Sequence, residues 1–168
     1  MTIEISLYDP GFSYPGQKQF DCGHAVINAF VRGSLKQQVK KRLSVAYVLT
    51  DPRQANRFAG FYTIAQHMID VSLVSDLHLG SLPRKIPCSR LIMLGVDEAY
   101  QGQQLGVRLM KHALALTRQV SAMVGSFGLY LDADPGALRF YLSLGFVPLQ
   151  GDCTPEASPM FLPLSAIA

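Results

Sequence analysis

Residues 91–119 read LIMLGVDEAYQGQQLGVRLMKHALALTRQ, and this stretch decides the fold. Leu91 to Val96 form a short run that is apolar apart from Gly95, which is typical of a strand covered on both faces. A bend rich in Gly and Gln follows. Apolar residues then recur at helical spacing, at Leu105, Leu109, Ala113, Leu116 and Val120. The stretch predicts a strand, a tight turn and a long helix.

The junction between that strand and that helix predicts an anion site. Free backbone N–H groups and the positive end of the helix macrodipole meet at a helix start, and a pyrophosphate uses both. Neither GxxxxGK[ST] nor GxGxxG occurs in the chain, so the nucleotide P-loop and the dinucleotide fingerprint are excluded. The alternative is an ordinary β-turn-α unit without a ligand.

Composition bounds the class of protein. The chain has 168 residues, of which 49% are hydrophobic and 16% charged, so we expect a single globular domain over 1–168. We expect no membrane span, because no apolar run approaches the roughly 18 residues that one requires. Cys22, Cys88 and Cys153 are far apart and form no CxxC or zinc pattern. We therefore expect no metal site and a reduced, cytoplasmic setting.

Basic residues gather in segments that lack acid. The formal net charge is only +3, yet no Asp or Glu lies between Asp21 and Asp51 or between Asp76 and Asp97. A cluster of basic residues without neighbouring acidic residues is typical of a surface that binds a polyanion such as coenzyme A or RNA. A solvated helix face is the alternative. The candidate nucleic-acid contacts are Arg32, Lys36, Lys40, Lys41, Arg84, Lys85 and Arg90.

The first half of the chain predicts a strand, a helix and a hairpin. Residues 2–8 alternate polar and apolar as a half-buried strand does. A helix is predicted from Asp21, which would cap it, to about Arg42, with a possible break at Gly33. Residues 45–50 and 58–68 are strand-like and flank a polar turn.

The later segments are predicted from turn residues. Residues 71–79 fit a short helix or a strand, and residues 82–87 are predicted to be a loop. A short strand is expected at 127–131. Asp134 and Pro135 predict a helix start, with the helix over 137–144 ending at Gly145. An extended segment at 146–148 and a closing strand at 160–162 complete the chain.

The bend resembles a known cofactor motif. Gln101 to Gly106 is similar to the acetyl-coenzyme A motif R/Q-x-x-G-x-G/A of the GCN5-related N-acetyltransferase (GNAT) family, with Gln101 and Gly106 at its two ends. Gln104 stands where the family has its first glycine. A position that needs positive φ would make this costly. We expect Gln104 instead to lie in the first helical turn, where its amide could donate to phosphate.

Two further stretches carry the resemblance. Residues 134–146, DPGALRFYLSLGF, are similar to the family pattern A-x-x-x-Y-x-x-x-G-F, whose tyrosine lies beside the thioester. Residues 20–23, FDCG, resemble the opening of the acetyltransferase toxins of bacterial toxin-antitoxin pairs, although His24 departs from their next residue. Those toxins acetylate the α-amine of aminoacyl-tRNA and are held inactive by a ribbon-helix-helix antitoxin. The resemblance also implies a homodimer.

The same resemblance implies the fold and the cofactor site. The expected class is α+β or α/β, with a mixed central sheet of about six or seven strands, splayed after the central strand and flanked by about four helices. The implied co-substrate is acetyl-coenzyme A. Its expected contacts are Leu94, Gly95, Val96, Gln101, Gly102, Gln103, Gln104, Leu105, Gly106, Val107, Asp134 and Ala137.

Acyl transfer needs carbonyl polarisation and a proton for the departing thiolate. Backbone N–H groups near Leu94 and Val96, opened by a bulge at Gly95, could hold the carbonyl oxygen. Tyr141 is the expected general acid, and a phenol with a pKa near 10 suits a positioned donor. Read without the resemblance, Tyr141 would be a core aromatic residue.

No base is evident in the motifs. An α-amine with a pKa near 8 needs less help to become neutral than a lysine ε-amine near 10.4, so the pattern leans towards α-amine acceptors. Asp97, Glu98, His67 and His78 could still enter the site on folding.

Three functions follow, of which a toxin-type N-acetyltransferase acting on aminoacyl-tRNA is the leading one. The second is an acetyltransferase for small-molecule or peptide amines. The third is a coenzyme A binding or interaction protein without turnover.

Overall fold

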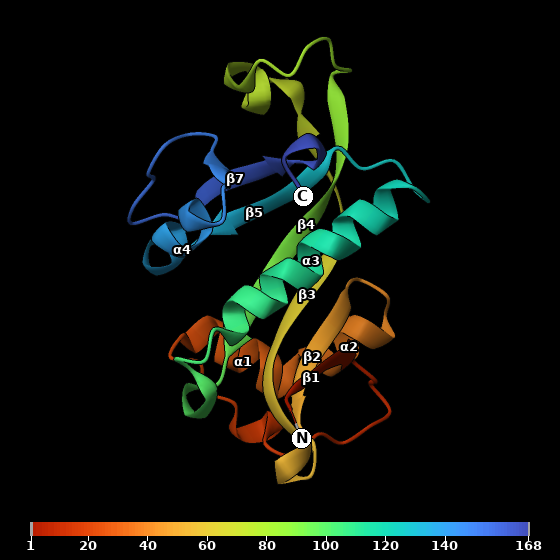
Figure 1. Ribbon diagram of the computed structural model, residues 1–168, viewed down its shortest axis with the longest axis vertical. Coiled ribbons are helices and arrows are strands. Elements are labelled where there is room, and N and C mark those ends of the chain that lie inside the picture. The colour runs from red at the N-terminus through yellow and green to blue at the C-terminus, as the bar shows by residue number, and fades with distance from the viewer. Residues whose placement is uncertain (1, 168) are drawn as a thin grey trace. The chain divides into compact units, whose positions relative to one another are not determined.

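A computed structural model describes residues 2–167 (Figure 1). Seven strands form a sheet in the order β1-β2-β3-β4-β5-β7-β6. The strands are β1 Glu4–Leu7, β2 Val45–Asp51, β3 Arg57–Asp70, β4 Lys85–Val96, β5 Gly128–Ala133, β6 Val147–Pro148 and β7 Ser158–Pro163. The α-helices are α1 Ala25–Gly33, α2 Leu35–Lys40, α3 Leu105–Ser121 and α4 Leu138–Ser143. Short 3-10 helices are η1 Gln17–Gln19, η2 Pro52–Gln54, η3 Val71–Leu77, η4 Glu98–Tyr100, η5 Pro135–Ala137 and η6 Leu164–Ala166.

The fold class expected from the sequence is confirmed. The sheet is mixed, because β4 and β5 are parallel whereas β1 and β2, β2 and β3, and β5 and β7 are antiparallel. Within residues 2–167, no helix is both long and apolar enough to cross a bilayer.

The chain forms two compact units. The first contains the residues up to Ala65 together with Ile92–Ala113, and the second contains Gln66–Leu91 together with the residues from Leu114 onward. Strands β3 and β4 and helix α3 therefore each contribute residues to both units.

The first unit is built on the predicted hairpin. Strands β2 and β3 pair in antiparallel register, with a bulge between Leu49 and Thr50. Its core is aromatic: the Phe20 ring meets the rings of Phe58 and Phe61 edge to face, with centroids 5.3 and 5.8 Å away. Such edge contacts add to the stabilisation from burial.

The start of α1 differs from the prediction. The N-cap is His24, whose Nδ1 accepts from the Ile27 N–H at 3.4 Å. Asp21 accepts instead from the Gly23 N–H and from the Asn28 amide, each at 2.9 Å. The carboxylate is therefore used to shape the turn before the helix. The break predicted near Gly33 is confirmed, because α1 ends there and α2 begins two residues later.

The second unit contains the parallel step of the sheet. Ser89 of β4 pairs with Leu129 of β5, and Arg90 pairs with Tyr130. Figure 1 shows β5 beside β7, with which it pairs along its whole length. The two strands that flank the long helix, β4 and β5, are therefore parallel.

Residues 69–87 are the most ambiguous segment of the sequence. Residues 71–77 form the 3-10 helix η3. The predicted loop over 82–87 is wrong at its end, because β4 begins at Lys85 and Ile86 is buried. Pro87 has no N–H to donate, but its carbonyl accepts from the Phe127 N–H at 2.8 Å. Pro87 lies near the start of β4, where a missing N–H disturbs the strand least.

Helix α3 buries the predicted face in part. Leu105, Leu109 and Ala113 are buried, whereas Leu116 and Val120 are half-buried. In the first unit, Arg108 donates to the Ile3 carbonyl at 3.0 Å. In the second unit, Arg118 donates to the Ile167 carbonyl at 2.6 Å.

Candidate functional site

The turn after β4 is held by a buried carboxylate. Asp97 accepts from the Ala99 N–H at 3.0 Å and from the Asp21 N–H at 3.1 Å. Its side chain is 6% exposed. Asp97 is one of the candidate bases, but both of its oxygens are engaged in shaping the turn. Its role in this structure is therefore to position the loop.

Gln101, the first residue of the motif, also positions the loop. Its amide donates to the Val96 carbonyl at 2.9 Å and to the Cys22 carbonyl at 3.2 Å. One side chain thus ties the loop to the end of β4 and to the segment before α1. The prediction that Gln101 contacts the cofactor stays a prediction.

The start of α3 is an anion site in its geometry. The first helical hydrogen bond runs from the Arg108 N–H to the Gln104 carbonyl at 3.2 Å. The N–H groups of Leu105, Gly106 and Val107 therefore have no carbonyl of the helix to bond. These three donors and the helix macrodipole act at one end of a helix of 17 residues.

Gln104 corrects an expectation. Its φ is +59°, which is the left-handed region, so it does not lie in the first helical turn as expected. Gly102 also has positive φ, at +81°. The loop therefore uses the left-handed conformation at the position where the family pattern has glycine, and a glutamine adopts it here at a cost. The Gln104 side chain is exposed.

The end of β4 is less covered than predicted. Ile92 is 39% exposed and Leu94 is half-buried, so the strand is not covered on both faces. A Cβ added at Gly95 would lie 3.2 Å from both Cys22 Sγ and Ile27 Cγ2. Glycine thus allows the segment around α1 to approach β4 closely.

Strand β4 also departs from a regular ladder. The Met93 N–H donates to the Thr63 hydroxyl at 3.2 Å, and a side chain thereby replaces a ladder carbonyl. This irregularity lies two residues before the predicted bulge at Gly95. The assignment of the Leu94 and Val96 N–H groups to a carbonyl oxygen stays a prediction.

Tyr141 lies in the second unit, on α4. Its side chain is 7% exposed, and its ring packs edge to face against Phe140 and Phe146 with centroids 5.1 and 5.8 Å away. Burial and the negative charge of Asp134 raise the pKa of Tyr141, so the phenol keeps its proton at neutral pH. Tyr141 is a core residue whose phenol keeps its proton, and its role as general acid stays a prediction.

The two remaining predicted cofactor contacts lie before α4. Asp134 is the N-cap residue of η5 and Ala137 is its last residue. The turn is held by the hydrogen bond from the Ala137 N–H to the Asp134 carbonyl at 2.8 Å. The backbone, rather than the predicted carboxylate cap, fixes this helix start.

Sequence reasoning misses a basic hollow next to the loop. A cavity of about 540 Å³ is lined by residues that include Arg53, Arg57, Tyr100 and Gln103. Its buried carboxylate, Asp51, accepts from Arg53 at 2.9 Å and from the Tyr100 hydroxyl at 2.8 Å. The hydrogen bond with Arg53 lowers the pKa of Asp51, so it stays charged and holds Arg53 in place. Arg53 lies in the hairpin turn and Arg57 directly after it, and this pair of arginines is the signal that the sequence offers.

The predicted basic contacts fall into two groups. Arg32, Lys36, Lys40 and Lys41 belong to the first unit, and Arg84, Lys85 and Arg90 belong to the second. Three of them have protein partners: Arg32 donates to the Phe20 carbonyl, Lys85 pairs with Asp70, and Arg90 pairs with Asp132. The side chains of Lys36, Lys40, Lys41 and Arg84 are exposed.

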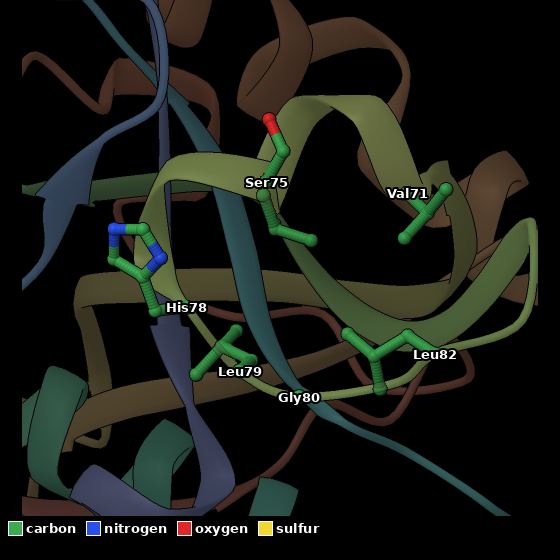
Figure 2. A pocket seen from close by; sticks show the side chains of 7 residues that line it. Val71, Ser75, His78, Leu79, Gly80 and Leu82 are labelled. Carbon is green, nitrogen blue, oxygen red and sulfur yellow. The ribbon is translucent and has the colours of Figure 1, made fainter.

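A second hollow, of about 400 Å³, is formed by η3 and the residues after it. Figure 2 shows His78 and Leu79 on one side of it and Val71 and Leu82 on the other. Apolar side chains dominate the lining. His78, one of the candidate bases, has φ +51° and lies there without another predicted site residue.

Comparison with known proteins identifies the family. The model of the acetyltransferase (GNAT) domain matches residues 47–148. A bacterial toxin crystal structure is 38% identical with a TM-score of 0.94, covering 99% of this chain and 93% of that chain. The toxin AtaT complexed with acetyl-methionyl-tRNAfMet is 27% identical with a TM-score of 0.87, covering 99% of this chain and 97% of that chain.

A third structure is a tyrosine-to-phenylalanine mutant of AtaT bound to the C-terminus of the antitoxin AtaR and acetyl-CoA. It is 28% identical with a TM-score of 0.82, covering 98% of this chain and 95% of that chain. The family model spans more than half of the chain, and the 38% identical toxin matches nearly all of it. The chain belongs to the GNAT family of N-acetyltransferases.

Proposed function

We propose that this protein is a toxin-type enzyme that transfers the acetyl group of acetyl-coenzyme A to the α-amine of aminoacyl-tRNA and so blocks translation. The observation that carries the proposal is the start of α3, where the N–H groups of Leu105, Gly106 and Val107 precede the first hydrogen bond of the helix and are left for a ligand. The pyrophosphate of coenzyme A is a ligand that such a point suits.

The loop has room for this group. A Cβ added at Gly102 would meet no atom within 4 Å, and the side chains of Gln101, Gln103 and Gln104 are exposed. When bound, acetyl-coenzyme A supplies an activated thioester. Leu105, Gly106 and Val107 would hold its pyrophosphate, and the backbone of Leu94 and Val96 would hold its pantetheine arm and thioester oxygen.

Tyr141 would give its proton to the coenzyme A sulfur as the carbon–sulfur bond breaks. Its raised pKa keeps the phenol protonated until that moment. A donor of this kind acts on the thiolate only as it forms, which requires a fixed position. Packing against Phe140 and Phe146 provides that fixed position.

The acceptor is proposed from the relatives and from charge. AtaT forms a complex with acetyl-methionyl-tRNAfMet. Lys36, Lys40 and Lys41 here are exposed cations that can contact phosphates of the RNA. Because AtaT also binds its antitoxin AtaR, we include an antitoxin of the ribbon-helix-helix type as a partner. A homodimer and a cytoplasmic location complete the proposal.

Radiolabelled acetyl-coenzyme A tests the acceptor. The protein is incubated with charged tRNA, with the same tRNA after deacylation, and with a panel of free amino acids and polyamines. Label should appear only on the charged tRNA and should be released by mild base that cleaves the aminoacyl ester. Label on free amines without tRNA would instead support an acetyltransferase for small molecules. Absence of acetyl-coenzyme A binding in calorimetry would reject both activities.

A further inference from the structure

Four polar side chains from three strands form one network in the second unit. His67 belongs to β3, Arg90 to β4, and Tyr130 and Asp132 to β5. The His67 and Tyr130 rings are in contact, with centroids 5.1 Å apart and planes tilted by 34°. The Tyr130 hydroxyl donates to Asp132 Oδ1 at 2.9 Å, and Arg90 Nη2 donates to Asp132 Oδ2 at 3.1 Å.

The network lies where the parallel pairing ends. Arg90 pairs with Tyr130 across the two strands, and its side chain reaches Asp132, two residues further along β5. Asp134 follows two residues later, and its charge acts on Tyr141. Asp134, whose charge acts on the proposed proton donor, therefore follows the network directly in the sequence.

One hydrogen-bond donor of Arg90 has no partner within residues 2–167 of the structure. Among the described residues, its Nε is the one buried side-chain polar atom without a hydrogen-bond partner. A buried donor without a partner costs free energy, and in a native protein such a group is one of the features that accompany a catalytic role.

His67 is neutral at the pH of the cell. Its half-buried position and the charge of Arg90 lower the pKa of His67, while Asp132 acts in the opposite direction. The groups that face it from the neighbouring strands are Arg90, Tyr130 and Asp132. Burial and the bond to Asp132 raise the pKa of Tyr130 to about 12, so Tyr130 stays protonated and does not compete as a base.

We propose that His67 is the general base that deprotonates the acceptor ammonium, within an acceptor site completed by Arg90, Tyr130 and Asp132. This inference rests on the proposed function. It supplies the base that the motifs lack, since an α-ammonium with a pKa near 8 is mostly charged at pH 7.

Every proton in the proposed acetyl transfer has a donor and an acceptor. An imidazole nitrogen of His67 takes one proton from R–NH3⁺, and the lone pair of the neutral amine then forms the bond to the thioester carbon. The carbon–sulfur bond breaks, the sulfur takes a proton from Tyr141, and the new amide nitrogen loses its extra proton, which restores Tyr141 through solvent. His67 finally releases its proton to water. The products are the N-acetyl acceptor, free coenzyme A and one proton.

His67→Gln and His67→Phe test the base by its pH signature. Both variants should bind acetyl-coenzyme A as the wild type does, and their kcat/KM with charged tRNA should fall about 100-fold at pH 6.5. The deficit should shrink towards pH 8.5, where the acceptor amine loses its proton unaided. His78→Asn is the matched control, because it removes a histidine outside the site from a backbone position that suits asparagine.

Substitutions of two charged residues next to His67 should shift the acid limb of the pH profile of kcat/KM in opposite directions. Arg90→Gln removes a charge that lowers the pKa of His67, so the limb should move to higher pH. Asp132→Asn removes the charge that raises the pKa, so the limb should move to lower pH. A structural role would not give opposite shifts.

The proposal would be overturned if kcat/KM of His67→Gln had the same pH dependence as that of the wild type. It would also be overturned if Arg90→Gln and Asp132→Asn shifted the acid limb in the same direction. If the wild type acetylates only free amines, the tRNA assignment fails, and the same profiles on that amine still decide the role of His67.

Discussion

Gln104 carries the clearest strain among the residues of the loop. A non-glycine residue in the left-handed region costs about 1–2 kcal/mol, and a glycine costs about 0.5–1 kcal/mol in added freedom of the unfolded chain. Gln104→Gly should therefore raise the free energy of unfolding by about 0.5–1 kcal/mol, as measured by urea denaturation. Gln103→Gly is the matched control, because Gln103 lacks positive φ and its replacement should lower stability. A decrease in stability in Gln104→Gly would mean that the side chain, not the backbone, matters there.

Tyr141 has a packing role and a proposed catalytic role, and one substitution separates them. Tyr141→Phe keeps the ring against Phe140 and Phe146 but removes the proton. Turnover should fall about 100-fold or more, while acetyl-coenzyme A binding measured by calorimetry stays within about twofold. Tyr47→Phe, in a ring stack with Tyr62 in the first unit, should leave turnover unchanged. Full activity of Tyr141→Phe would remove it from the proposed role.

The sequence nominates site residues but does not give their local geometry. Gln101 to Gly106 and Tyr141 are nominated by the resemblance to the family motifs, and their roles stay predictions. Spacing cannot show that Gln104 has positive φ, because glutamine gives no sign of a left-handed backbone. The basic hollow beside Tyr100 escapes prediction since its residues are distant in the chain and join only when the hairpin folds.

The approach of the α1 segment to β4 is set by one glycine. Gly95→Ala would place a methyl group 3.2 Å from Cys22 Sγ and Ile27 Cγ2. Since these neighbours would have to move, the free energy of unfolding should fall by about 1–3 kcal/mol. The comparison is with Gly125→Ala, where a Cβ meets nothing within 4 Å. Equal stability of the two variants in urea would show that the close approach is easily relieved.

The packing of α3 on β3 includes a titratable pair. The Tyr62 hydroxyl and His112 Nδ1 are 2.6 Å apart, and burial lowers the pKa of His112 below its ordinary value of 6.5. The unfolded state therefore binds the proton more tightly, and stability declines as the pH falls below about 6.5. Urea denaturation at pH 7.5 and 5.5 should show this decline.

The variant that tests this assignment is His112→Gln, whose free energy of unfolding should depend less on pH. His78→Asn is the control and should show the pH dependence of the wild type, because His78 is exposed. An unchanged pH dependence in His112→Gln would assign the effect to other groups.

At the scale of the whole chain, the predicted order of elements is correct. Periodicity and turn residues predict the hairpin, the β4-α3-β5 step and α4. The errors in element bounds fall at the ends of helices and strands, because tertiary packing sets where an element begins. Ile86 is buried in a core, so β4 begins at Lys85, earlier than Pro87 suggests. The prediction of a single domain over 1–168 stays a prediction.

Binding of RNA should show in its salt dependence. The triple variant Lys36→Gln, Lys40→Gln and Lys41→Gln removes three exposed charges. The slope of log K against log salt concentration for charged tRNA should become less steep by about 1 for each phosphate that the variant no longer neutralises. Lys18→Gln with Lys111→Gln removes exposed charges elsewhere and should change the slope less. Equal slopes in all three proteins would reject the proposed RNA contacts.

Arginines on α3 hold residues near both ends of the described chain, Arg108 at Ile3 and Arg118 at Ile167. An affinity tag or fluorescent fusion joined close to either carbonyl would compete with these bonds. A fusion joined through a long flexible spacer would preserve them. Activities measured on tightly fused protein should therefore be compared with those of protein from which the tag has been cleaved.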